Sequence, residues 1–174
     1  MRRLCARLSA SLRLPAPTDP RELFAAVAGA LSGLRDREVR LCFLRFPPGT
    51  VSGIWLDGDD GDLIVVEESA PPQHQLVILG HEIWHLHAGD RGGHASGATA
   101  AARAPASATD LRRVAAAVAA RGDLATAQER AAERFGIMLG SELRPWLEAR
   151  PGGPPEHGLA GRIHASLGRR RAVG

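Results

Sequence analysis

The sequence predicts an α+β fold in which a small, antiparallel three-stranded sheet packs on helices. Three observations predict it. Two early segments show helical signals, three short apolar segments alternate with turn residues, and a helix-length apolar run from Gln75 to Leu86 follows them. The segments that we expect to be strands are 39–46, 51–56 and 63–67.

The first two helices have recognisable ends. Residues 2–13 predict a short helix that Pro15 stops, because proline lacks the N–H that the next turn needs. The second helix has Asp19 as its N-cap, Pro20 at its first position and Glu22 to complete a capping box. We expect it to end near Gly33.

The three strands are separated by turn residues. Pro47-Pro48 closes the first strand, and the Asp- and Gly-rich segment 57–62 separates the second from the third. This acidic segment lacks the downstream glutamate of a calcium-binding loop, so we interpret it as a hairpin turn. The third strand, 63–67, is the edge at which we expect an extended peptide to pair.

The apolar run then continues as a helix that Pro71-Pro72 opens. At 100° per residue its apolar positions form one stripe, which predicts a centrally buried helix. The stripe consists of Leu76, Leu79, Ile83 and Leu86. His74 lies on the side opposite this stripe, about 10 Å from His81 along the axis at 1.5 Å per residue, which is too far to share a metal ion; we therefore interpret it as a structural residue.

The same helix carries the motif H-E-x-x-H as His81, Glu82 and His85. Residues four apart share one helical face, so the two imidazoles can hold one metal ion. Imidazole nitrogen and carboxylate oxygen are ligands typical of Zn²⁺. Glu82 adjoins this site and is placed to accept a proton from a water molecule at the metal. The sequence therefore predicts a zinc site with Glu82 as its catalytic base.

Two histidines need a third ligand, and an acid on a later helix is the best candidate. Glu129 and Glu133 lie four residues apart on one face of a predicted helix over 123–144, which Pro145 ends or kinks. If Glu129 binds the metal, Glu133 can accept a hydrogen bond from a histidine as an outer ligand. Spacing alone permits the reverse assignment.

The remaining segments and the charge bound the function. We expect one domain over 1–147 with a flexible loop over 89–108, a helix over 110–120, and a poorly ordered Pro/Gly/Arg-rich tail over 148–174. The net charge of +3 lies in the tail, so nucleic acid is not an expected partner. No apolar run could span a membrane, and two cysteines without metal spacing favour a reduced, cytoplasmic protein with buried thiols.

The motif residues resemble those of the ImmA/IrrE metallopeptidases, and the resemblance covers about residues 1–145. It rests on His81 to His85, on Gly53-Ile54-Trp55-Leu56, and on the segment from Glu129 to Phe135. The short actinobacterial members, often labelled toxin components of toxin–antitoxin pairs, are the most similar. The resemblance implies a zincin-like active-site helix and Glu129 as the metal ligand. Trp84 replaces a small residue of the family, so we expect a narrower site.

The function implied is a zinc-dependent metallopeptidase that cuts a partner protein, typically a helix-turn-helix transcriptional repressor. The alternative is a metal-stabilised module that binds its partner without cleavage. Because the chain has no tyrosine, the donor that stabilises the transition state must be His87, His94, an arginine or the metal itself.

Overall fold

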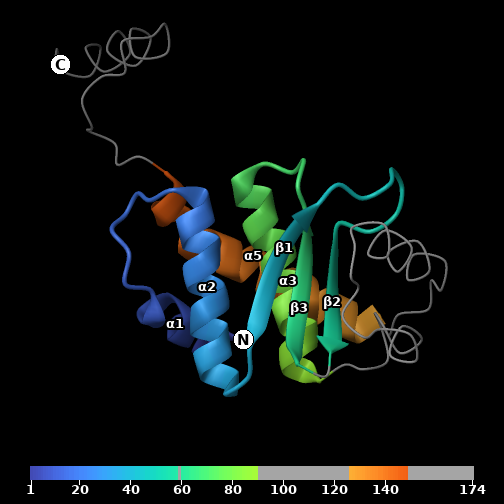
Figure 1. Cartoon of the computed structure of the whole chain (residues 1–174), viewed down its shortest axis with the longest axis horizontal. Helices are drawn as coiled ribbons and strands as arrows, with labels where there is room; N and C mark the ends of the chain where they lie inside the picture. Colours follow the sequence, from blue (N-terminus) through green and yellow to red (C-terminus); the bar gives the residue numbers. More distant parts are fainter. Residues whose placement is uncertain (59, 90–125, 149–174) are drawn as a thin grey trace, which may run out of the picture.

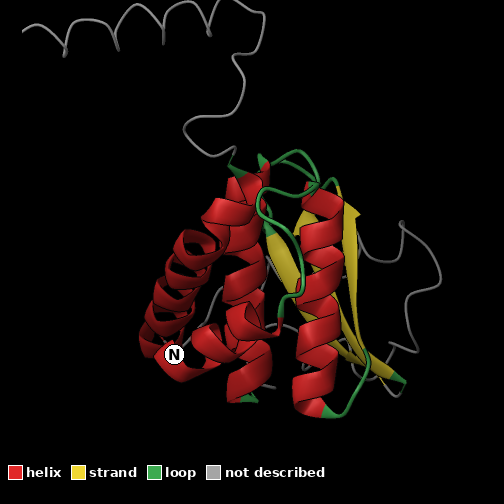
Figure 2. Ribbon diagram, turned by 90° about the vertical axis from the view of Figure 1, so that its left-hand side faces the viewer, coloured by secondary structure: helices red, strands yellow, loops and turns green. Residues whose placement is uncertain are grey.

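The computed structural model describes residues 1–58, 60–89 and 126–148, which form a sheet with helices packed on one of its faces (Figures 1 and 2). The α+β prediction is confirmed. In chain order the elements are α1 (Arg2–Ser11), α2 (Pro20–Arg35), β1 (Val39–Leu44), β2 (Gly53–Gly58), β3 (Gly61–Glu67), α3 (Pro72–Ala88) and α5 (Thr126–Leu147). Apart from residues 89 and 148, the predicted loop over 89–108 and tail over 148–174 lie outside the described residues, as does the predicted helix over 110–120.

The sheet is mixed, so the prediction of an antiparallel sheet is only partly right. The order is β1-β3-β2: β3 pairs with β2 in antiparallel register through the expected hairpin, but it pairs with β1 in parallel register. The chain leaves β1, crosses to the far edge as β2 and returns between the two. Alternating apolar residues predict where strands lie but carry no information about their order.

The central place of β3 also overturns the prediction that a peptide pairs with the edge of 63–67. Both sides of β3 are occupied, by β1 through Val39↔Asp62 to Leu44↔Glu67 and by β2 through Gly53↔Val66 to Gly58↔Gly61. The outer strands of the sheet are β1 and β2 (Figure 1).

Helix α3 lies at the centre of the core, as its pattern predicts. The four residues of its apolar stripe are each at most 2% exposed, and they pack with side chains from α1, α2, α5 and the sheet. A smaller apolar cluster includes Val65, whereas its neighbours Ile64 and Val66 belong to the main core. Because successive side chains of a strand point to opposite faces, this second cluster lies on the other face of the sheet.

The helix ends follow the local sequence. The Asp19 carboxylate accepts a hydrogen bond from the backbone N–H of Arg21 at 2.8 Å, which confirms the predicted N-cap. Helix α2 runs two residues past Gly33, to Arg35. Helix α5 continues through Pro145 to Leu147, so the proline does not end it. A missing N–H is tolerated there because only the last turn follows it.

The two cysteines differ in their exposure. Cys5 is buried and Cys42 is partly exposed, so the prediction of buried thiols holds for Cys5 alone, and both thiols are free.

Among the described helices, none combines the length and the hydrophobicity that crossing a membrane would require.

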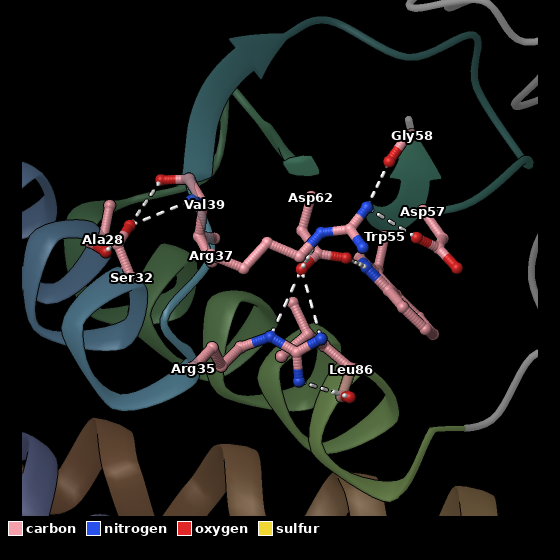
Figure 3. Close-up of polar contacts among 10 residues, drawn as sticks. All are labelled: Ala28, Ser32, Arg35, Arg37, Val39, Trp55, Asp57, Gly58, Asp62 and Leu86. Atoms are coloured by element: carbon pink, nitrogen blue, oxygen red, sulfur yellow. Dashed lines mark hydrogen bonds and ion pairs between the residues drawn. The ribbon is translucent and has the colours of Figure 1, made fainter. Parts of the chain in front are cut away.

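A buried carboxylate joins the end of α2 to the sheet and to α3 (Figure 3). Asp62 is fully buried, and its oxygens accept hydrogen bonds from the Trp55 indole at 2.8 Å and from Arg35 Nε at 3.2 Å. Arg37 Nε lies 3.5 Å from the same carboxylate. Arg35 also donates to the carbonyl of Leu86 at 3.2 Å, in the last turn of α3. One charge therefore fixes the positions of β2 and of the end of the motif helix.

We expect Asp62→Asn to lower the free energy of unfolding by about 2 kcal/mol, because the buried side chain loses the charge that strengthens its contacts with the partly exposed Arg35 and Arg37. The measurement is urea unfolding followed by circular dichroism. The matched control is Asp57→Asn, because Asp57 meets Arg37 at 2.9 Å where both side chains are about one-third exposed. That change should cost about 1 kcal/mol or less. Equal losses from the two variants would contradict the role given to Asp62.

Candidate metal centre

Helix α3 brings the two motif histidines together on one face. His81 and His85 are one turn apart, and their Nε2 atoms lie 3.0 Å from each other. His85 is 1% exposed, whereas 22% of the His81 side chain remains exposed. The pair therefore has one ring inside the protein and one at the surface of a cavity.

Glu129, in the first turn of α5, completes a group of three ligands. Its Oε2 atom lies 3.4 Å from His81 Nε2, and its Oε1 atom lies 3.3 Å from His85 Nε2. One potential ligand atom from each of the three residues falls within a span of 4.8 Å. The structure thus brings together the residues that the sequence predicted as metal ligands.

A close crossing of α3 and α5 makes this meeting possible; α5 passes behind α3 in Figure 1. A Cβ atom on Gly136 would lie 2.5 Å from the Val77 carbonyl oxygen and 3.2 Å from the backbone nitrogen of His81. A Cβ atom on Gly80 would lie 2.8 Å from the Cα atom of Gly136. Any side chain at either position would push the helices apart. The glycines therefore hold the Glu129 helix close to the histidines.

The geometry of the group fits a divalent cation. Tetrahedral ligands at the usual zinc distances of about 2.0–2.2 Å lie about 3.3–3.6 Å from one another. The two distances between carboxylate and imidazole fall in this range, and the distance between the imidazoles is slightly shorter. Two imidazoles and one carboxylate leave one tetrahedral position for water or substrate. His81, His85 and Glu129 could therefore hold a metal ion.

Glu82 lies beside this group and is 3% exposed. Burial raises the pKa of Glu82 to about 8, and the nearby Glu129 carboxylate contributes to this rise. A hydrogen bond from the Trp55 backbone acts in the opposite direction and lowers the pKa. Within the described part of the chain, its Oε2 atom has no hydrogen-bond partner. A buried carboxylate oxygen without a partner is costly, so this atom is a candidate for proton transfer rather than for a structural contact.

His81, Glu129 and Glu82 line a cavity of about 490 Å³, and the buried His85 lies behind its wall, against His81 and Glu129. One wall is the segment that leads into β2, another is α3 and the third is α5. The residues that line it are Thr50, Val51, Ser52, Gly53, His74, Val77, Ile78, His81, Glu82, Glu129, Glu133 and Ile137. Gly53 has to be small, because a Cβ atom there would lie 2.8 Å from Glu82 Oε1.

Trp84 and His74 differ from their sequence interpretations. The Trp84 ring packs on Phe135, with centroids 5.5 Å apart, and does not line the cavity, so the expected narrowing is wrong. His74 does line the cavity, although the sequence suggested only a structural role. Its spacing of seven residues from His81, two turns on one face, was the available signal. Two histidines were proposed as the donor that stabilises the transition state. Of these, His87 does not line this cavity, and His94 lies outside the described residues.

No protein-family model matches this sequence, and no curated protein or solved structure shows significant similarity to it. The resemblance to the ImmA/IrrE metallopeptidases therefore rests on motif residues and their spacing. Its residue assignments stay predictions.

The open choice between Glu129 and Glu133 has a geometric answer within the described residues. Glu129 contacts both imidazoles, whereas Glu133 is an exposed residue on the cavity wall and has no recorded hydrogen bond to either histidine. Its predicted role as an outer ligand stays a prediction.

We expect the chain to bind about one divalent ion, and His81→Ala, His85→Ala and Glu129→Ala each to weaken binding by more than about 100-fold. Loss of a ligand should exceed the 10–100-fold effect of losing an outer contact. The measurement is competition with a chromogenic chelator. His74→Ala, in the same cavity, is the control and should bind normally. Glu133→Gln should weaken binding about tenfold if Glu133 supports a histidine. Tight binding by Glu129→Ala would contradict the assigned ligand set.

We expect Gly136→Ala to lower both stability and metal affinity, because the added Cβ would meet the Val77 carbonyl oxygen. Overpacking of this kind costs about 1–3 kcal/mol. The control is Gly33→Ala on α2, where nothing lies within 4 Å of the added Cβ; it should stabilise the helix by about 0.5–1 kcal/mol. Thermal unfolding with and without metal measures both effects. A metal affinity unchanged in Gly136→Ala would contradict the role of the crossing.

Proposed function

We propose that this chain is a zinc-dependent metallopeptidase of the ImmA/IrrE type, which hydrolyses a peptide bond in a partner protein. The observation that carries the proposal is the convergence of His81, His85 and Glu129 in one group at the wall of a cavity that the buried Glu82 also lines. Three protein ligands and a vacant fourth position are typical of catalytic rather than structural zinc sites.

The metal, when bound, would polarise a peptide carbonyl and make a water molecule acidic enough to lose a proton near neutral pH. Glu82 is the residue that receives this proton and returns it to the leaving amine. Its partnerless Oε2 atom supports that role, because the atom is not engaged in holding the fold. A bound cation would also lower the raised pKa of Glu82, since the positive charge favours the ionised carboxylate.

The remaining roles follow from position. The Trp55 backbone hydrogen bond orients the Glu82 carboxylate. His74 lines the same cavity but does not belong to the ligand group, so its proposed role is to contact a bound substrate. The family resemblance adds the kind of partner: a helix-turn-helix repressor in a regulatory or toxin–antitoxin-like pair, encoded near this chain.

We expect Glu82→Gln to lose proteolysis by at least about 100-fold, the usual effect of removing a general base, while it keeps the metal. The assay is co-expression with a helix-turn-helix protein encoded beside this chain's gene, with cleavage read by mass spectrometry. The control is Glu68→Gln, an exposed residue that pairs with Arg45. Full cleavage by the Glu82 variant would show that the mechanism is wrong.

The same variant separates cleavage from binding alone. A metal-stabilised binding module would regulate its partner equally well with Gln at position 82, and the partner would stay intact with the wild-type chain. A hydrolase requires both the cut partner and the loss of effect in the variant.

A further inference from the structure

The cavity at the metal centre has an apolar end that the proposed chemistry does not use. Ile137 is 60% exposed and is the exposed large hydrophobic residue among those that the structure describes. It is not an isolated surface residue, because Val51, Val77 and Ile78 line the same cavity. An apolar surface of this kind, bordered by polar groups, is typical of a binding site.

This apolar end has a defined distance from the metal ligands. Val77 precedes His81 by one turn of α3, which is about 6 Å along the axis. Ile137 directly follows Gly136, where an added Cβ would lie 2.5 Å from the Val77 carbonyl oxygen, so Ile137 lies beside Val77 where the two helices cross. An extended peptide advances about 3.3 Å per residue, so 6 Å corresponds to about two residues. The apolar end can therefore contact a side chain close to a peptide bond held at the metal.

The walls of this end are fixed by close packing. The Val77 side chain approaches Gly140, where an added Cβ would meet its Cγ2 atom at 2.9 Å. Ile78 is 5% exposed and touches the first residue of β2, since a Cβ on Gly53 would lie 2.7 Å from its Cγ2 atom. A preformed apolar surface needs little reorganisation when it binds a ligand.

We propose that Ile137, Val77 and Val51 form a specificity subsite that binds a large aliphatic side chain of the substrate within two residues of the bond that is cut. This inference rests on the proposed function. The chosen occupant is a leucine-like side chain, because the three residues offer aliphatic contact and no hydrogen-bonding group.

The test measures binding to the zinc-loaded full chain, not turnover. Two pairs of hydroxamates serve as probes, because a hydroxamate binds zinc directly. The first pair consists of two amino-acid hydroxamates, one with an isobutyl group and one with hydrogen at the α-carbon. The second pair consists of two succinyl hydroxamates that differ in the same way, by isobutyl or hydrogen on the succinyl chain. The two pairs place the side chain on opposite sides of the zinc-binding group. We expect the isobutyl member of at least one pair to bind about tenfold more tightly, for about 1.4 kcal/mol of apolar contact.

Variants of Ile137 decide whether this preference arises at the subsite. Ile137→Ser should remove the preference and Ile137→Leu should retain it, and both should fold because the side chain is largely exposed. Arg144→Ser, on α5 but outside the cavity, should behave as wild type. Equal affinities within both pairs, or a preference that survives in Ile137→Ser, would overturn the subsite.

The outcome also separates this inference from the proposed function. Zinc-loaded protein that cuts its partner but shows no isobutyl preference refutes only the subsite. A preference that depends on Ile137, in a chain that cuts nothing, supports the subsite and counts against the hydrolase. Zinc-loaded protein that binds none of the four hydroxamates refutes the subsite, because the cavity then admits no ligand at the metal.

Discussion

The candidate metal centre depends on how closely α3 and α5 can approach each other. Its ligands come from both helices, and a carboxylate on one reaches imidazoles on the other only if the backbones nearly touch. The Gly80 and Gly136 pair meets this condition, and Gly136 lies level with the His81 backbone nitrogen. Helices that pack through larger side chains are about 8–10 Å apart at their axes. Two residues without ligand atoms therefore set the distance on which the ligand geometry depends.

Two buried carboxylates show how the fold separates structure from chemistry. Asp62 is surrounded by an indole and two guanidinium groups, so its charge is paired and its role is structural. Glu82 is almost as deeply buried, but one of its oxygens has no partner within the described residues. Trp55 connects them, because its side chain donates to Asp62 and its backbone donates to Glu82. The paired carboxylate thus helps to position the one that is left available.

The sequence predicted the parts of the site that depend on local spacing. The motif histidines share a face because they are four residues apart, and the apolar stripe of α3 is buried as its periodicity requires. The order of the strands was not predictable from alternation, so the parallel pairing of β1 with β3 was missed. Spacing alone does not distinguish Glu129 from Glu133; the family resemblance favoured Glu129, and the crossing of α3 and α5 places Glu129 against both imidazoles. The apolar end of the cavity also requires three separate segments to meet, which no single pattern encodes.

The unequal burial of the three possible ligands leaves one side of the group accessible. His85 is enclosed, whereas His81 and Glu129 each keep more than one-fifth of their side chains exposed. The accessible side of the group therefore faces the cavity that also contains Glu82. Val77, Ile137 and His74 line the same cavity. In the proposed peptidase, a polypeptide bound along α3 would contact an aliphatic side chain one helical turn from His81 and an imidazole about two turns away, because Val77 and His74 precede His81 by four and seven residues.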